Sequence, residues 1–114
     1  MTLEQVLDWA DRMKPGNCFS NEDKTVWISE LEGMARQALL QEGDNVYHWP
    51  EDRHCELIVQ APHDRVYRHY VLAQMSYANE EYDRYNNEYE MFNATWQEWL
   101  NWVCRVVRPA YREK

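Results

Sequence analysis

Glycine, proline and cysteine are scarce in this chain of 114 residues, and their placement excludes several kinds of site. The three glycines stand far apart, so no glycine-rich loop is available to cradle a phosphate. Cys18, Cys55 and Cys104 are odd in number and share no C-x-x-C spacing, which is typical of thiols in a reducing cytoplasm. No apolar run approaches the length of about 18 residues that a transmembrane helix needs, and residues 1–14 lack the apolar core of a signal peptide.

Positive charge is also in short supply, and the formal net charge is -8. Nonspecific binding to duplex nucleic acid needs clustered lysine and arginine, so the balance argues against it. The charge is uneven, because residues 105–114 carry Arg105, Arg108, Arg112 and Lys114 against a single acid, Glu113. This basic end predicts either an acidic protein partner or a solubilising tail.

Leucine, isoleucine, valine and phenylalanine together number 21, about 18% of the chain. That fraction, combined with the net charge, would ordinarily indicate disorder. Six tryptophans and eight tyrosines supply the missing apolar area, however. We therefore expect one folded domain, residues 1–114, with an aromatic core, since two domains would each be too small for a stable core.

A long stripe of apolar and aromatic residues dominates the second half of the sequence. Its members follow one another in steps of three and four, which places them on one side of a helix. They are Val71, Met75, Ala78, Tyr82, Tyr85, Tyr89, Phe92, Trp96, Trp99, Val103 and Val106.

Helix start and stop signals predict an all-α fold of three to five helices. Thr2 opens a capping box, and the sequence Lys-Pro-Gly at 14–16 ends that first helix. Ser20 begins a second helix, for which Gly43 is the expected stop. Asp64 caps the helix that carries the stripe to about Arg108.

The stripe predicts either one long helix or a helical hairpin. A continuous helix would measure about 65 Å, which is long for a chain of this size. A tight turn near Asn79 or at Asn86-Asn87 would fold the stripe back on itself.

Residues 44–62 interrupt the helical rhythm and are bracketed by Pro50 and Pro62. Only "ELIVQ" at 56–60 has strand character, so we expect a long loop with at most a short β element. The segment looks too polar for the core, yet Tyr47, Trp49 and residues 57–59 are costly to leave in water. It is therefore predicted to make contacts between subunits or with a tail-side partner.

Candidate catalytic and metal-binding groups are present but poorly arranged. The cluster of His48, His54, Cys55 and His63 complies only loosely with the ligand spacing of zinc sites. Cys104 sits beside the helical stripe rather than on the sharp, exposed turn expected of a nucleophile. Neighbouring carboxylates, such as the pairs at 80–81 and 51–52, are predicted to lie on the surface in contact with water rather than to aim at one substrate. We expect no catalytic residue, cofactor or metal, and no enzymatic activity.

The aromatic stripe itself is the best candidate for function. Tyrosine is favoured where a ring is buried while its hydroxyl stays wet, as at subunit interfaces, although a plain helical core explains the stripe equally well. Tyr67, Tyr70 and Tyr77 lie partly off the stripe and widen the aromatic surface. The residues predicted to pack or to oligomerise are Tyr82, Tyr85, Tyr89, Phe92, Trp96 and Trp99.

Residues 61–99, "APHDRVYRHYVLAQMSYANEEYDRYNNEYEMFNATWQEW", resemble a family of small phage and prophage proteins, the head–tail connectors, also called adaptor or head-completion proteins. That family typically shows Pro-Tyr-Asp, a tyrosine-rich helix, a "YANGE-DRYNN" core and then "MFN". The opening "TLEQVLDWADRMKP" and the "WISELEG" of residues 27–33 also fit the family. Three departures are His63 in place of tyrosine, Glu80 in place of the usual glycine, and the C-terminal end "RVVRPAYREK"; the second argues against a turn at Asn79.

The resemblance implies a structural protein that forms a homo-oligomeric ring under the portal of a packaged capsid, in the virion. Such a protein is made in the bacterial cytoplasm and contacts the portal and a tail-side completion protein, away from any membrane. DNA would pass through the ring without sequence-specific binding, helped by an acidic wall that repels phosphates. From their position and charge, Arg105, Arg108, Tyr111 and Arg112 are the residues predicted to reach the portal.

Two alternatives remain open at the level of sequence. One is a small acidic phage inhibitor that mimics DNA, although the carboxylates here are spread along the chain rather than gathered. The other is a generic helical oligomerisation module, which would form a small closed dimer.

Overall fold

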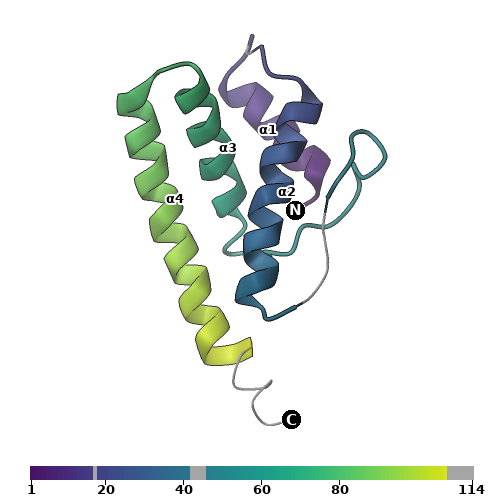
Figure 1. The fold of residues 1–114 in the computed structure, drawn as a ribbon, viewed down its shortest axis with the longest axis vertical. Helices are drawn as coiled ribbons and strands as arrows, with labels where there is room; N and C mark the ends of the chain where they lie inside the picture. Colours follow the sequence, from purple (N-terminus) through teal and green to yellow (C-terminus); the bar gives the residue numbers. More distant parts are fainter. Residues whose placement is uncertain (17, 42–45, 108–114) are drawn as a thin grey trace.

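The computed structural model describes residues 1–16, 18–41 and 46–107, which form four α-helices and one π-helical turn (Figure 1). This arrangement confirms the predicted all-α fold. In the described part of the chain, pairing of the β type is limited to one isolated bridge between Thr2 and Glu56. The elements are α1 (Leu3–Met13), α2 (Asn21–Ala38), α3 (Arg65–Ala78), α4 (Tyr82–Trp102) and the π-helical turn η1 (Val103–Val107).

Two of the three predicted N-terminal caps, Thr2 and Ser20, accept a backbone amide proton through their side chains, whereas Asp64 stands at the N-cap of α3 without a side-chain cap bond. The side-chain oxygen of Thr2 accepts the Gln5 amide proton at 3.3 Å, and the Gln5 side chain accepts the Thr2 amide proton at 2.9 Å. The hydroxyl oxygen of Ser20 likewise accepts the Asp23 amide proton at 3.1 Å. Each bond satisfies an amide that the first turn of a helix leaves unpaired, which fixes where α1 and α2 begin.

Helix α2 ends earlier than its glycine predicts. The helix stops at Ala38, and Leu40 adopts a left-handed conformation with a φ of 58°. The amides of Leu40 and Gln41 bond back to the carbonyls of Gln37 and Arg36 at 3.1 and 3.0 Å. This is a Schellman motif built without glycine, so Gly43, which lies outside the described residues, is not needed to end the helix.

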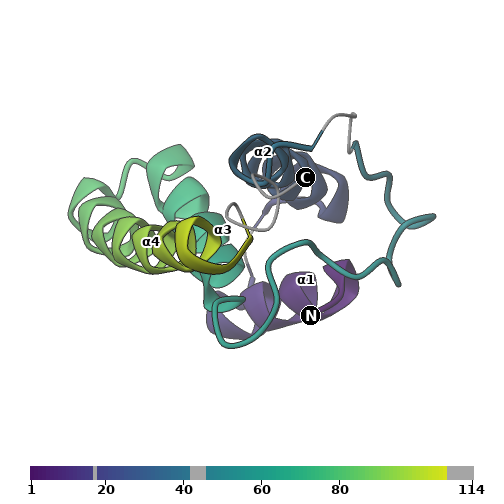
Figure 2. The same cartoon turned by 90° about the horizontal axis from the view of Figure 1, so that it is seen from below.

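Helices α1, α2 and α3 surround the core, and α4 lies along the outer side of α3 (Figures 1 and 2). Buried apolar side chains from the three inner helices meet at the centre. They include Leu3, Val6, Leu7, Ile28, Leu31, Ala35, Val66, Val71 and Met75. Because α4 packs chiefly on α3, much of its surface faces away from the other helices.

The stripe is a helical hairpin rather than a single rod. The chain turns at residues 79–81, one of the two positions expected from sequence, and Glu80 adopts a left-handed φ of 61°. The amides of Glu80 and Glu81 bond to the carbonyls of Tyr77 and Ser76 at 3.1 and 2.8 Å, as in a second Schellman motif. Glutamate at position 80 argues against this turn, yet the turn forms, because the two backbone bonds are made although Glu80 carries a Cβ in a left-handed conformation.

Polar contacts fasten α1 to its neighbours. Lys24, which is almost fully buried in α2, reaches the Asp11 carboxylate on α1. Lys14, just after α1, donates to the Ser76 hydroxyl of α3 at 2.9 Å. The Arg68 guanidinium of α3 lies 5.1 Å from the ring centroid of Trp9 in a cation–π contact.

The central segment contributes to the core, which corrects the expectation that it is too polar to do so. Leu57 and Val59 are 1% and 0% exposed and belong to the main apolar cluster. Backbone bonds tie residues 53–57 to the first residues of the chain, from Leu3 to the Cys55 carbonyl at 3.1 Å and from Leu57 to the Met1 carbonyl at 3.1 Å. Exposed residues of this segment lie on both sides of Cys55, at positions 46, 48, 50, 51, 53 and 54 before it and at 56 and 60–62 after it.

Candidate functional site

Seven aromatic rings form a continuous series along the α3–α4 hairpin, which we call the aromatic ladder. Successive ring centroids lie 5.0 to 6.2 Å apart, the range in which aromatic pairs attract one another. Six of the rings come from α4 at the predicted spacing of three and four residues, and Tyr77 joins them from α3. In order, the ladder consists of Tyr82, Tyr77, Tyr85, Tyr89, Phe92, Trp96 and Trp99.

Exposure changes sharply along the ladder. At the end near Trp99, Phe92 and Trp99 are each 2% exposed and belong to the core. At the end near the hairpin turn, Tyr77 and Tyr82 are 57% and 56% exposed, and Tyr89 is 38% exposed. The ladder is therefore core at one end and surface at the other. Half-buried Tyr85 lies in the exposed half near the hairpin turn, and half-buried Trp96 lies in the buried half near Trp99.

Contacts from α3 and α2 fix the position of the ladder. The Tyr70 ring lies 5.2 Å from Phe92, and its hydroxyl donates to the Glu30 carboxylate of α2 at 3.3 Å. Burial, followed by the nearby Glu30 charge, raises the pKa of Tyr70 to about 12, so this phenol stays a donor. Nδ1 of His69 lies 3.2 Å from a Glu88 carboxylate oxygen and links α3 to α4 directly.

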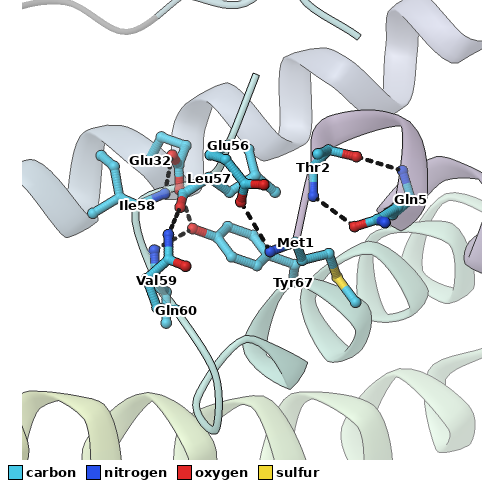
Figure 3. A network of polar contacts seen from close by, with 10 residues as sticks. All are labelled: Met1, Thr2, Gln5, Glu32, Glu56, Leu57, Ile58, Val59, Gln60 and Tyr67. Atoms are coloured by element: carbon cyan, nitrogen blue, oxygen red, sulfur yellow. Dashed lines mark hydrogen bonds and ion pairs between the residues drawn. The ribbon is translucent and has the colours of Figure 1, made fainter. Parts of the chain in front are cut away.

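A second polar centre lies around the Glu32 carboxylate, which is 0% exposed (Figure 3). The Tyr67 hydroxyl donates to one of its oxygens. The Tyr47 hydroxyl and the Ile58 amide donate to the other at 3.0 and 2.9 Å. The Tyr67 oxygen in turn accepts the Val59 amide proton at 2.8 Å. One carboxylate thus joins α2, α3 and both ends of the central segment.

The charge state of this centre follows from burial. Burial raises the pKa of Glu32 above its ordinary value, while the hydrogen bonds from Tyr67, Ile58 and Tyr47 oppose part of that rise. Burial and the adjacent Glu32 charge also raise the pKa of Tyr67 and of Tyr47, so both phenols remain protonated donors. The three protein donors satisfy both oxygens of the Glu32 carboxylate, as expected of a buried polar group.

The residues of the predicted basic end are only partly described. Arg105 lies in η1 and is exposed. Arg108, Tyr111 and Arg112 lie outside the described residues, so their predicted contact with the portal stays a prediction.

The candidate metal ligands do not converge. Among the residues that the structure describes, no three histidine, cysteine or acidic side chains are grouped so as to hold a metal ion. His63 instead packs against Trp102, with ring centroids 5.9 Å apart, and His54 lies beside Arg53 with 3.2 Å between Nε2 and Nε. Cys18, Cys55 and Cys104 form no disulfide. None of the described helices combines the length and apolar character needed to cross a bilayer.

Sequence reasoning missed the part played by Glu32, Tyr67 and Tyr77. Glu32 looks like one more acid in the charged run "SELEG", and nothing local marks it as buried. The sequence predicts that Tyr67 widens the aromatic surface, whereas it is fully buried and bonded to Glu32. Tyr77 joins the ladder because the turn brings it across to Tyr82 and Tyr85, a contact that linear spacing does not reveal.

Comparison with protein-family models, with curated proteins and with solved structures finds no match to this chain.

Proposed function

We propose that this chain is a structural phage protein, a head–tail connector whose copies form a ring beneath the portal and leave a passage for DNA. The proposal rests on the resemblance of residues 61–99 to that family and on one structural observation, the exposed half of the aromatic ladder. It assigns the chain an architectural role, with the portal on one side and a tail-side completion protein on the other.

The exposed half of the ladder supports a contact between copies. Tyr77, Tyr82 and Tyr89 each expose more than a third of their surface, and their rings touch one another or Tyr85. A contiguous aromatic patch of this kind is costly in water and typical of protein interfaces. Tyrosine also suits such a contact because its ring buries area while its hydroxyl finds a partner at the edge.

The position of the ladder is compatible with a ring. A ring needs a heterologous interface, in which one face of each copy meets a different face of the next. The ladder runs along a hairpin at the outer edge of the molecule, where α4 packs chiefly on α3. A neighbour that docks there leaves the opposite side, formed by α1, α2 and the central segment, available to the next copy.

The charge balance supports the passage of DNA. The net charge of -8 includes the exposed acids Asp83, Glu90 and Glu98 on α4. A wall of this sign repels phosphates and lets a duplex slide without being held.

Electron microscopy of the purified full-length protein, alone and mixed with a portal, tests the proposal. We expect closed rings, and rings seated on the portal in the mixture. A protein that forms only compact two-fold dimers and ignores the portal would instead be a generic helical oligomerisation module.

A pair of variants tests the role of the ladder directly. The double change Tyr82→Ala with Tyr89→Ala removes two exposed ladder rings, and Met91→Ala removes a side chain that is 52% exposed on α4 outside the ladder. We expect the double variant to sediment as a smaller species than wild type while keeping its helical circular dichroism, and Met91→Ala to assemble normally. Normal assembly of the double variant would show that the ladder is not part of the interface between copies.

A further inference from the structure

A groove lies between the first half of α2 and the central segment, on elements that make no part of the ladder. Its volume is about 560 Å³, within the range of about 300–1,000 Å³ typical of binding clefts. A smaller hollow of about 270 Å³ adjoins it and shares Val26 and Tyr47. The groove is lined by Glu22, Thr25, Val26, Tyr47, His48, Trp49, Glu51 and Asp52, and we call it the acidic groove.

The lining of the acidic groove combines carboxylates with aromatic rings. Glu22 and Glu51 are exposed, and neither joins an ion pair within the described part of the chain. The Asp52 carboxylate already has a partner within the central segment, because it accepts the His48 amide proton at 2.8 Å. Half-buried Trp49 forms part of the apolar wall.

These features suit a cationic segment with some apolar character. Carboxylates at a rim pair with arginine and lysine, and arginine also stacks on tryptophan and tyrosine faces. No lysine or arginine is among the residues that line the groove where the structure describes it. A peptide that carries several positive charges and one or two apolar residues is therefore its complementary ligand.

The chain itself contains such a segment. Residues 105–114, "RVVRPAYREK", carry four positive charges and one negative charge in a chain whose net charge is -8. The segment also includes Val106, Val107 and Tyr111, which supply apolar contact. We propose that the acidic groove binds this basic C-terminal segment from a neighbouring copy of the chain, an inference that rests on the proposed assembly of copies.

The length of the segment favours a neighbouring copy over the same chain. Val107 lines a hollow together with Leu39, at the far end of α2 from the acidic groove. Thr25 lies about 21 Å from Leu39 along the helix axis, at a rise of about 1.5 Å per residue. Five residues, from Val107 to Arg112, span at most about 18 Å even when fully extended. To reach the end of the groove at Glu22 and Thr25 within one chain, the segment would thus have to be stretched, whereas a neighbour can present it there without that cost.

Photo-crosslinking in the full-length protein tests the inference. Tyr111→p-benzoylphenylalanine is introduced, unlabelled and ¹⁵N-labelled copies are mixed, and the crosslinked peptides are identified by mass spectrometry. We expect crosslinks between the two isotopic forms that map to residues 22–30 and 46–52. The same photoreactive residue in place of Met91, on α4 outside the ladder, is the positional control, and the yield of any crosslink it forms should not depend on the charges of Glu22 and Glu51. Crosslinks confined to one isotopic form, to other parts of the chain or to an added portal protein would overturn the inference.

Removal of charge from the groove provides a second test of the inference. Glu22→Gln with Glu51→Gln neutralises the rim, and Glu90→Gln with Glu98→Gln removes the same charge from exposed positions on α4. Because each exposed ion pair contributes modestly, we expect the groove variant to lower the crosslink yield by about 2- to 30-fold while the α4 variant leaves it unchanged. Equal yields in the two variants would contradict the role of the groove.

The two proposals fail in different ways. If wild-type copies sediment as monomers at every concentration and give no crosslinks between isotopic forms, the proposed assembly and this inference fall together. If copies form rings but Tyr111 crosslinks elsewhere, only the inference about the acidic groove is wrong.

Discussion

At the scale of single residues, Glu32 is the side chain on which most of the described polar structure converges. It is fully buried, and it holds α2, α3 and the central segment together through three donors. A glutamine amide in place of the carboxylate would present N–H groups to these donors, so Glu32→Gln should destabilise the protein by roughly 1–3 kcal/mol. Urea unfolding followed by circular dichroism measures the loss.

The pH dependence of that loss has a definite sign. Burial raises the folded-state pKa of Glu32 above its value in the unfolded chain, so the folded protein holds this proton more tightly. The stability that the group contributes is therefore fully present below the unfolded pKa and is lost as pH rises through the folded pKa. We expect the difference in unfolding free energy between wild type and Glu32→Gln to narrow as pH rises through the folded pKa, with Glu90→Gln, at an exposed position on α4, as the control. A gap that widens with pH would mean that hydrogen bonding outweighs burial at this site.

Two neighbouring rings of the ladder should differ strongly in their effect on stability. Phe92 is 2% exposed, so Phe92→Ala should cost about 3–5 kcal/mol through lost burial and a residual cavity. Tyr89 is 38% exposed, and its loss should cost less than about 1.5 kcal/mol, the size of an aromatic pair contact. Unfolding free energies of the two variants at low protein concentration check this difference. Equal costs would place both rings in the same environment.

At the scale of elements, the turn between α3 and α4 contains backbone strain at Glu80 that a glycine would relieve. Glu80 occupies a left-handed conformation with a φ of 61°, which disfavours any residue with a Cβ. After allowance for the greater freedom of glycine in the unfolded chain, Glu80→Gly should stabilise the protein by roughly 0.5–1 kcal/mol. Glu90→Gly, in the middle of α4, should destabilise it by about 1 kcal/mol. A loss of stability in both variants would show that the Glu80 side chain contributes more than its backbone strain costs.

At the scale of the whole molecule, the ladder predicts a gradient of backbone protection along α4. Residues 82–90 of that helix are exposed or half-buried, whereas Phe92, Thr95 and Trp99 are anchored in the core. In the isolated subunit, amide exchange should therefore be faster in residues 82–90 than in residues 92–103, because local opening is easier where few apolar contacts resist it. Assembly should slow exchange chiefly in the first of these regions. Unchanged exchange there on assembly would place the contact between copies elsewhere.

Much of this architecture is predictable from the sequence because it depends on local signals. The caps at Thr2 and Ser20 and the spacing of the ladder rings are local, and each appears in the structure as predicted. The burial of the central segment is harder to predict, because its average polarity hides an alternation in which Leu57 and Val59 point inward. The burial of Glu32 is not predictable, since it depends on a tyrosine 35 positions away and on two separate parts of the loop. The acidic groove likewise joins α2 to residues that lie far along the chain.

The pairing of the first residues with residues 53–57 also sets an order of events during synthesis. Leu3 and Glu4 donate their amide protons to the carbonyls of Cys55 and Arg53 at 3.1 and 3.0 Å, so α1 lacks the partner of its first turn until that segment has been made. At roughly 5–20 residues per second, a ribosome needs about 3–10 s to cover the interval. During that time the apolar side of α1 has only α2 to meet, and the nascent chain is open to chaperones.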